Sequence, residues 1–271
     1  MARVIVITSG KGGVGKTTTT SNIGMALARL GYNTLLVDAD IGLRNLDLLL
    51  GLENRIIYTG LDVLAETCRL EQALITDKRQ SKLTFFPLSS NQAKSPLTKE
   101  QIQELINLLK DKYDYILIDS PAGIDEGFQT AVLPATEALV VVTPEVPSIR
   151  DADKVIGILV AQDIKKISLL VNRIRPKMVK TDDMMSIDDV KNILGVPLAG
   201  VIPDSEQVII ASNRGEPLVL EEKLSLPGLA FENTARRLLG EEVDFLNLDT
   251  PTSRNPVKRL FNNFINKSKT D

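Results

Sequence analysis

The chain has 271 residues, of which 43% are hydrophobic and 25% charged, a composition typical of a folded globular protein that buries a sizeable core. It contains no histidine and a single cysteine, which excludes imidazole acid–base catalysis, histidine-based metal sites and an intrachain disulfide framework. The formal net charge of −3 excludes a molecule whose overall charge attracts nucleic acid, although a local basic patch is compatible with it.

Short apolar runs alternate with longer amphipathic stretches along the chain. Most of the apolar runs are continuous Val, Ile and Leu segments, as expected of parallel strands that helices cover on both faces. This alternation predicts an α/β fold with a doubly wound, mostly parallel sheet and helices on both faces. The predicted strands span 3–8, 34–38, 83–88, 115–119, 138–143, 167–172 and 197–203, and the predicted helices span 16–30, 98–112, 126–134, 148–162, 186–194, 205–213 and 227–239.

The composition changes near the end of the chain. We expect a nucleotide-binding domain over 1–249, a linker over 250–256 (TPTSRNP) and a separate tail over 257–271. No run of about 18 apolar residues is present, and the N-terminus lacks the features of an export signal. We therefore expect a protein that neither crosses a membrane nor is exported.

The stretch GKGGVGKT (10–17), between the first predicted strand and helix, fits two templates. Its Gly10-x-Gly12-x-x-Gly15 spacing is that of a dinucleotide-binding fingerprint, whereas Gly10 and Gly15 followed by Lys16-Thr17 form a P-loop. The lysine and threonine favour the P-loop, because a P-loop lysine reaches the terminal phosphates and the hydroxyl binds Mg²⁺, whereas a dinucleotide site uses neither.

Carboxylates at the ends of neighbouring predicted strands also favour the P-loop. Asp38 and Asp40 follow the second strand, and Asp119 ends the strand 115–119. The carboxyl ends of parallel strands form the ligand crevice of an open sheet, and Mg²⁺ prefers such oxygen ligands. Asp38 alone would equally suit the ribose-binding acid of a dinucleotide enzyme.

A P-loop wraps backbone N–H groups around a phosphate at the positive end of a helix. Here that cradle would run from Gly12 to Thr18, with Lys16 bridging the β- and γ-phosphates and Thr17 binding Mg²⁺. The predicted nucleotide-binding residues of the loop are Gly10, Lys11, Gly12, Gly13, Val14, Gly15, Lys16, Thr17 and Thr18.

Three stretches carry a resemblance to a known family: KGGVGKTT (11–18), VDADIGLRNLD (37–47) and IDSPAGI (118–124). Together with 144–159, 169–176, 200–208, 211–217 and the basic amphipathic tail, they resemble the deviant Walker A (ParA/MinD) ATPases, and among them the branch that places the division site, over nearly the full chain. The resemblance implies a P-loop fold that uses ATP and Mg²⁺ and hydrolyses ATP to ADP and phosphate.

The resemblance also implies roles for individual residues. It implies that Lys11 reaches across a dimer interface to the partner's phosphates, as an arginine finger does. It implies that Asp40 positions the attacking water, that Asp38 and Asp119 lie at the Mg²⁺, and that the Gly123 amide senses the γ-phosphate. From the residues alone, Lys11 could instead be a solvated loop lysine, and each aspartate could cap a neighbouring loop. The resemblance places Asn172 against the adenine, with Pro203 and Asp204 nearby.

Partners follow from the same resemblance. It implies a homodimer when ATP is bound, a MinC-like division inhibitor and a MinE-like activator, with no nucleic acid. The predicted helix 148–162 carries Arg150, Asp151 and Asp153 where the family docks partners. A charged, solvated helix face explains these three residues equally well.

The tail 257–271 has the pattern of a basic amphipathic helix. Its apolar residues follow the i, i+3, i+4, i+7, i+8 spacing, and the polar positions are cationic, which predicts binding to an anionic membrane surface. The alternative is an ordinary C-terminal helix docked on the core. The predicted membrane-binding residues are Val257, Lys258, Arg259, Leu260, Phe261, Phe264 and Ile265.

Two other functions share parts of this pattern. A partition-type ATPase acts on DNA and needs a basic surface and no lipid tail, and a P-loop phosphotransferase or ligase needs an acceptor pocket with its own acid–base group. The expected location is the cytoplasm, peripheral on the inner face of the cell membrane, or the stroma and inner envelope of a chloroplast. Cys68 is expected to be a packing residue.

Overall fold

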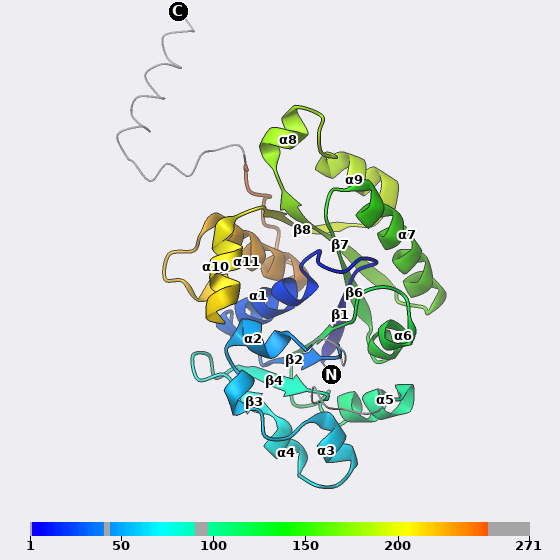
Figure 1. Ribbon diagram of the computed structural model, residues 1–271, viewed down its shortest axis with the longest axis vertical. Coiled ribbons are helices and arrows are strands. Elements are labelled where there is room, and N and C mark those ends of the chain that lie inside the picture. Colours follow the sequence, from blue (N-terminus) through cyan, green and yellow to red (C-terminus); the bar gives the residue numbers. More distant parts are fainter. Residues whose placement is uncertain (1, 41–43, 90–96, 249–271) are drawn as a thin grey trace, which may run out of the picture.

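A computed structural model describes residues 2–40, 44–89 and 97–248. Within these ranges eight strands form one sheet in the order β3-β4-β2-β5-β1-β6-β7-β8 (Figure 1). Every pair of neighbours is parallel except β3 and β4, which are antiparallel. The strands are β1 (Arg3–Thr8), β2 (Thr34–Asp38), β3 (Ile75–Thr76), β4 (Leu83–Pro87), β5 (Tyr115–Asp119), β6 (Glu137–Val142), β7 (Lys166–Ile174) and β8 (Leu198–Pro203).

Helices cover both faces of the sheet. Residues of α5, α6, α7 and α9 pack in the core cluster on one face, and residues of α1, α2 and α11 pack in the cluster on the other. This confirms the predicted doubly wound fold. The helices are α1 (Lys16–Arg29), α2 (Leu46–Leu50), α3 (Gly60–Leu64), α4 (Leu70–Ala73), α5 (Lys99–Asn107), α6 (Glu126–Val132), α7 (Val146–Ala161), α8 (Pro176–Lys180), α9 (Ile187–Leu194), α10 (Glu206–Arg214) and α11 (Leu226–Leu239).

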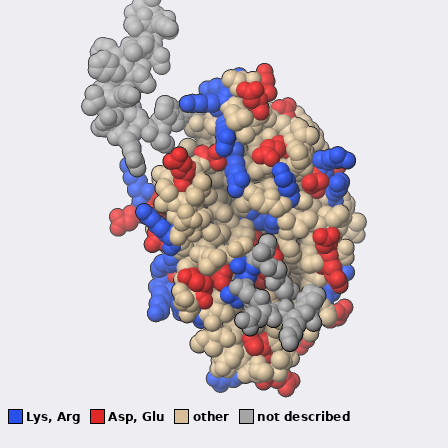
Figure 2. Space-filling view, in the orientation of Figure 1, with Lys and Arg blue, Asp and Glu red and all other residues tan. Residues whose placement is uncertain are grey.

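The surface carries both signs of charge. On the face shown in Figure 2, lysine and arginine side chains are interspersed with aspartate and glutamate, in line with the formal net charge of −3. Neither sign forms an unbroken field over the visible described residues. A protein with such a surface relies on local sites, not on its overall field, to bind charged ligands.

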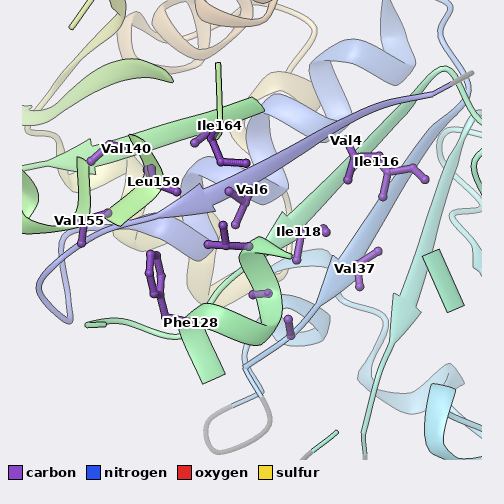
Figure 3. Packing of buried hydrophobic residues seen from close by; sticks show 14 of the residues in the cluster. Val4, Val6, Val37, Ile116, Ile118, Phe128, Val140, Val155, Leu159 and Ile164 are labelled. Atoms are coloured by element: carbon purple, nitrogen blue, oxygen red, sulfur yellow. The ribbon is translucent and has the colours of Figure 1, made fainter. Parts of the chain in front are cut away.

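The centre of the sheet is buried on both sides. All five residues of β5 are buried, as expected of a central parallel strand. Figure 3 shows Phe128 of α6 on the same side of the sheet as Val6 and Ile118, and all three side chains are fully buried. Cys68 is half-buried against this cluster, which confirms its predicted packing role.

The predicted linker 250–256 and the predicted tail 257–271 lie outside the described residues. Within the described ranges, each helix is either too short or too polar to pass through a bilayer.

Candidate functional site

The glycine-rich loop lies between β1 and α1, as predicted. Gly15 stands at the N-terminus of α1 with φ at +99°, and a Cβ built there would lie 2.3 Å from Asn172 Nδ2. Glycine is therefore required at this position for both its backbone angle and the space. Among the described residues no side chain caps the first amides of α1, so these N–H groups are available to an anion.

Asn172 braces the loop from the end of β7. Its Nδ2 donates to Val14 O at 2.7 Å, and its Oδ1 accepts from Arg173 N at 2.9 Å. The family resemblance implied only a contact between Asn172 and adenine. The amide keeps a second N–H for a ligand, so the brace and the predicted contact are compatible.

The loop is also held by the segment after β5. Gly123 N donates to Ser9 O at 3.1 Å, and Ser9 Oγ donates to Lys11 O at 2.8 Å. The Gly123 amide, which the resemblance assigns to the γ-phosphate, is engaged with the loop in this structure. It would have to leave Ser9 O in order to bind a ligand.

Lys16 is buried among acidic side chains at the carboxyl end of the sheet. The residue is 8% exposed, and burial lowers its pKa while the charges of Asp119 and Asp40 oppose that shift. Asp119 is 1% exposed and accepts a hydrogen bond from Thr20 Oγ1 at 3.0 Å. Burial raises the pKa of Asp119 to about 6, against the opposing effects of the Thr17 hydroxyl and Lys16.

Asp38 lies beside Asp119, because these two residues are register partners at the ends of β2 and β5. The residue is 3% exposed, and its carboxylate accepts hydrogen bonds from Asp40 N at 3.1 Å and Leu46 N at 3.2 Å. Burial, and then the charge of Asp119, raise the pKa of Asp38 well above its usual range. Two adjacent buried carboxylates with raised pKa values, next to the Thr17 hydroxyl, are a donor set that suits a hard divalent cation.

Lys11 lies apart from this buried cluster. Its Nζ contacts Glu145 Oε2 at 3.4 Å, and the two side chains are 44% and 53% exposed. Glu145 is the residue before α7. Lys11 is thus held at the protein surface, whereas Lys16 faces the carboxylates.

The residues predicted near the adenine are brought together at the ends of β7 and β8. Pro203 pairs with Ile174 in the sheet, and Asp204 N donates to Ile174 O at 3.0 Å. Asp204 is exposed and accepts from Arg175 Nε at 2.7 Å. Asn172 lies two residues before Ile174 on β7, so the three predicted base-side positions lie at the same end of the paired strands β7 and β8.

The first turns of α7 pack against the loop. A Cβ built on Gly10 would lie 2.4 Å from the backbone carbonyl carbon of Asp151. Arg150 and Asp153 are exposed, and the Asp151 side chain pairs with Lys154 at 3.3 Å. The predicted partner segment therefore has one side on the nucleotide loop and another in solvent.

Replacing Asp119 with asparagine is expected to stabilise the nucleotide-free protein at pH 8 by about 1–3 kcal/mol. The pKa of Asp119 in the fold, about 6, lies above its ordinary value of 3.8, so the cost of its charge is absent in acid and complete above pH 7. Asparagine keeps an oxygen for Thr20 and carries no charge. Thermal unfolding should show a larger gain at pH 8 than at pH 4.5.

The control for this prediction is Asp47→Asn. Asp47 is a buried carboxylate that pairs with Arg44 at 2.8 Å, so its neutralisation should destabilise the protein. An equal effect of Asp119→Asn at both pH values would contradict the predicted charge penalty.

Comparison with known proteins identifies the family. The model of the CobQ/CobB/MinD/ParA nucleotide binding domain matches residues 5–218. The chain is 70% identical over 268 residues to a putative septum site-determining protein MinD of Emiliania huxleyi, a match that covers 99% of this chain and 98% of that protein.

Solved structures give the same result. The chain matches a chain of the MinC:MinD cell division protein complex of Aquifex aeolicus with 51% identity and a TM-score of 0.84, covering 91% of this chain and 99% of that one. It matches the septum site-determining protein MinD complexed with Mg-ADP from Pyrococcus horikoshii OT3 with 31% identity and a TM-score of 0.78, covering 88% and 96%. The chain therefore belongs to the MinD family of septum site-determining proteins, within the CobQ/CobB/MinD/ParA nucleotide-binding group.

Proposed function

We propose that the protein hydrolyses ATP to ADP and phosphate with Mg²⁺ and acts as a switch that places the division site. The loop from Gly10 to Thr18 holds the phosphates, Lys16 neutralises the β- and γ-phosphate oxygens, and Asp40 orients the attacking water. Thr17, Asp38 and Asp119 would hold Mg²⁺, which would supply charge neutralisation on the phosphates. Asn172, Pro203 and Asp204 bind the base.

The contrast between the two lysines is the observation that carries this proposal. Lys16 is buried with Asp119 and Asp40, whereas Lys11 sits at the surface on Glu145. A surface lysine on the phosphate loop is suited to reach a nucleotide bound to a second copy of the chain, so we propose that ATP is hydrolysed within a homodimer.

Dimerisation would also control membrane residence. We propose that the tail 257–271 binds anionic lipid weakly on its own, with about 1 kcal/mol from each lysine or arginine near the surface. Two tails on one dimer bind as a bivalent anchor, which raises affinity by about 10²–10⁴-fold. The protein would be peripheral on the inner face of a bacterial cell membrane, or on the inner envelope in a chloroplast stroma.

We propose that partners bind to α7 and that their binding depends on the nucleotide in the loop. The packing of Gly10 against the backbone of Asp151 connects the loop to the helix, and Arg150 and Asp153 are exposed beside that contact. The Aquifex relative was solved as a MinC:MinD complex, which supports a MinC-like inhibitor as one partner. A MinE-like activator is the proposed second partner.

The test is sedimentation with liposomes that contain anionic lipid. A non-hydrolysable ATP analogue is expected to produce a dimer in solution and to raise liposome binding by about 10²-fold or more over ADP. Light scattering measures the dimer and co-sedimentation measures the bound fraction. Equal binding with the two nucleotides would refute the proposed switch.

Two control measurements separate the alternative functions. A partition-type ATPase would bind DNA and not liposomes. In a gel-shift assay with ATP, it would retard a DNA fragment, and in the sedimentation assay it would leave the liposomes unbound. A phosphotransferase would pass the phosphoryl group of ATP to an added acceptor without releasing phosphate, and a ligase would release phosphate only with an added acceptor. Release without an acceptor, together with liposome binding, supports the proposed function.

A further inference from the structure

Two short helices start at opposite sides of the proposed nucleotide site. At the N-terminus of α2, Leu46 N donates to Asp38 Oδ2 at 3.2 Å, on the side of the phosphates. The helix α10 begins after Ser205, directly beyond Asp204 on the side of the base. A shift of α2 would therefore alter the phosphate side of the proposed site, and a shift of α10 would alter the base side.

The far ends of these helices touch each other. Gly51 ends α2 with φ at +61°, and Gly215 ends α10 with φ at +64°. A Cβ built on Gly215 would lie 2.7 Å from Gly51 Cα, and one built on Gly51 would lie 3.0 Å from Gly215 O. The two backbones thus meet where only glycine fits.

The Arg79 guanidinium joins this contact. It donates to Leu50 O at the end of α2 and to Gly215 O at the end of α10, the latter at 3.0 Å. Its Nε and Nη2 also donate to the two oxygens of Asp77, at 3.0 and 2.6 Å. Asp77 is buried, and its Oδ1 accepts from Arg79 N at 2.7 Å. One planar fork therefore ties both helix ends to a fixed carboxylate.

We propose that Arg79 is a positioning residue for the Mg²⁺-nucleotide site. By fixing the C-terminal ends of α2 and α10, it keeps the first amide of α2 on Asp38 and so orients that carboxylate. The inference rests on the proposed function, in which Asp38 lies at the Mg²⁺. Removing an interaction that orients a metal-site ligand typically weakens metal affinity by about 10–100-fold.

The test is Arg79→Lys. Lysine keeps a positive charge beside Asp77, but its single ammonium lacks the planar fork that reaches both carbonyls together. The Mg²⁺ concentration for half-maximal binding of a fluorescent, non-hydrolysable ATP analogue is expected to rise about tenfold or more. The analogue is not hydrolysed, so the rate of hydrolysis does not enter the measurement.

Arg3→Lys is the matched control. Arg3 makes the same kind of contact at the amino end of the sheet, with two bonds to Glu137 at 2.6 and 2.7 Å and one to Leu238 O at 2.6 Å. Its replacement should lower the melting temperature and leave the Mg²⁺ requirement unchanged. If both variants melt lower and both bind Mg²⁺ like the unmodified protein, the Arg79 fork is only structural and the proposal fails.

A second variant separates the helix contact from the ion pair. Gly215→Ala pushes the two helix ends apart without removing Arg79 or Asp77, and should raise the Mg²⁺ requirement in the same way. Gly240→Ala is its control, because Gly240 ends α11 with φ at +92° and a Cβ there meets nothing within 4 Å. Equal Mg²⁺ requirements for these two variants would overturn the proposal. Unmodified protein that binds the analogue without Mg²⁺ dependence would refute the proposed function itself.

Discussion

Lys11→Ala is expected to lower the rate of ATP hydrolysis by about 10³-fold and to leave the ATP-loaded protein monomeric. In the proposed dimer, Lys11 leaves Glu145 and neutralises the phosphates bound to the other copy, so its loss removes both a link between the copies and a charge in the transition state. Phosphate release and light scattering measure the two effects. ATP affinity of the monomer should change little, because Lys16 and the loop amides remain.

Lys154→Ala is the matched control for this variant. Lys154 is also an exposed lysine in a 3.3 Å pair with an acidic residue, Asp151, but it lies on α7 outside the phosphate loop. It should dimerise and hydrolyse ATP like the unmodified protein. A Lys11→Ala protein that still forms dimers with ATP would show that this lysine acts only within its own subunit.

The strands and the larger helices were predictable because their signals are local. A continuous apolar run such as YILID predicts a buried parallel strand when runs of this kind alternate with amphipathic stretches. Among the strands and α-helices of the described residues, those that the sequence did not predict are β3, α2, α3, α4 and α8, which have two to five residues each. A segment of that length covers little more than one helical turn, so it carries no periodic pattern.

The acidic cluster of the site was predictable for a related reason. Asp38 and Asp119 end neighbouring strands, and the topology of a parallel sheet brings such ends to one edge. The contacts of Asn172 with Val14, Lys11 with Glu145 and Arg79 with Gly215 join residues 158, 134 and 136 positions apart. Each depends on how separate elements pack, and a single sequence holds no local signal for such contacts.

Phe261→Asp is expected to abolish ATP-dependent liposome binding. The substitution places a charge in the apolar stripe of the predicted tail helix, where Val257, Leu260 and Phe264 would enter the lipid. Because the proposed anchor is bivalent, the substitution weakens both tails of the dimer. If the two tails no longer bind together, the affinity for the liposome falls by about 10²–10⁴-fold from the lost avidity alone. Co-sedimentation with the ATP analogue measures the change.

Asn262→Asp is the control, since it adds the same charge to the adjacent polar position of the tail. It should weaken the attraction to anionic lipid by about 1 kcal/mol per tail, or about 30-fold for the two tails of a dimer, and leave ATP-dependent binding measurable. Both variants should still bind the ATP analogue and dimerise in solution, because the nucleotide site is built from residues before 205. If Phe261→Asp also abolished nucleotide binding, the tail would be part of the folded core, and the nucleotide would control membrane residence by some route other than two tails held on one dimer.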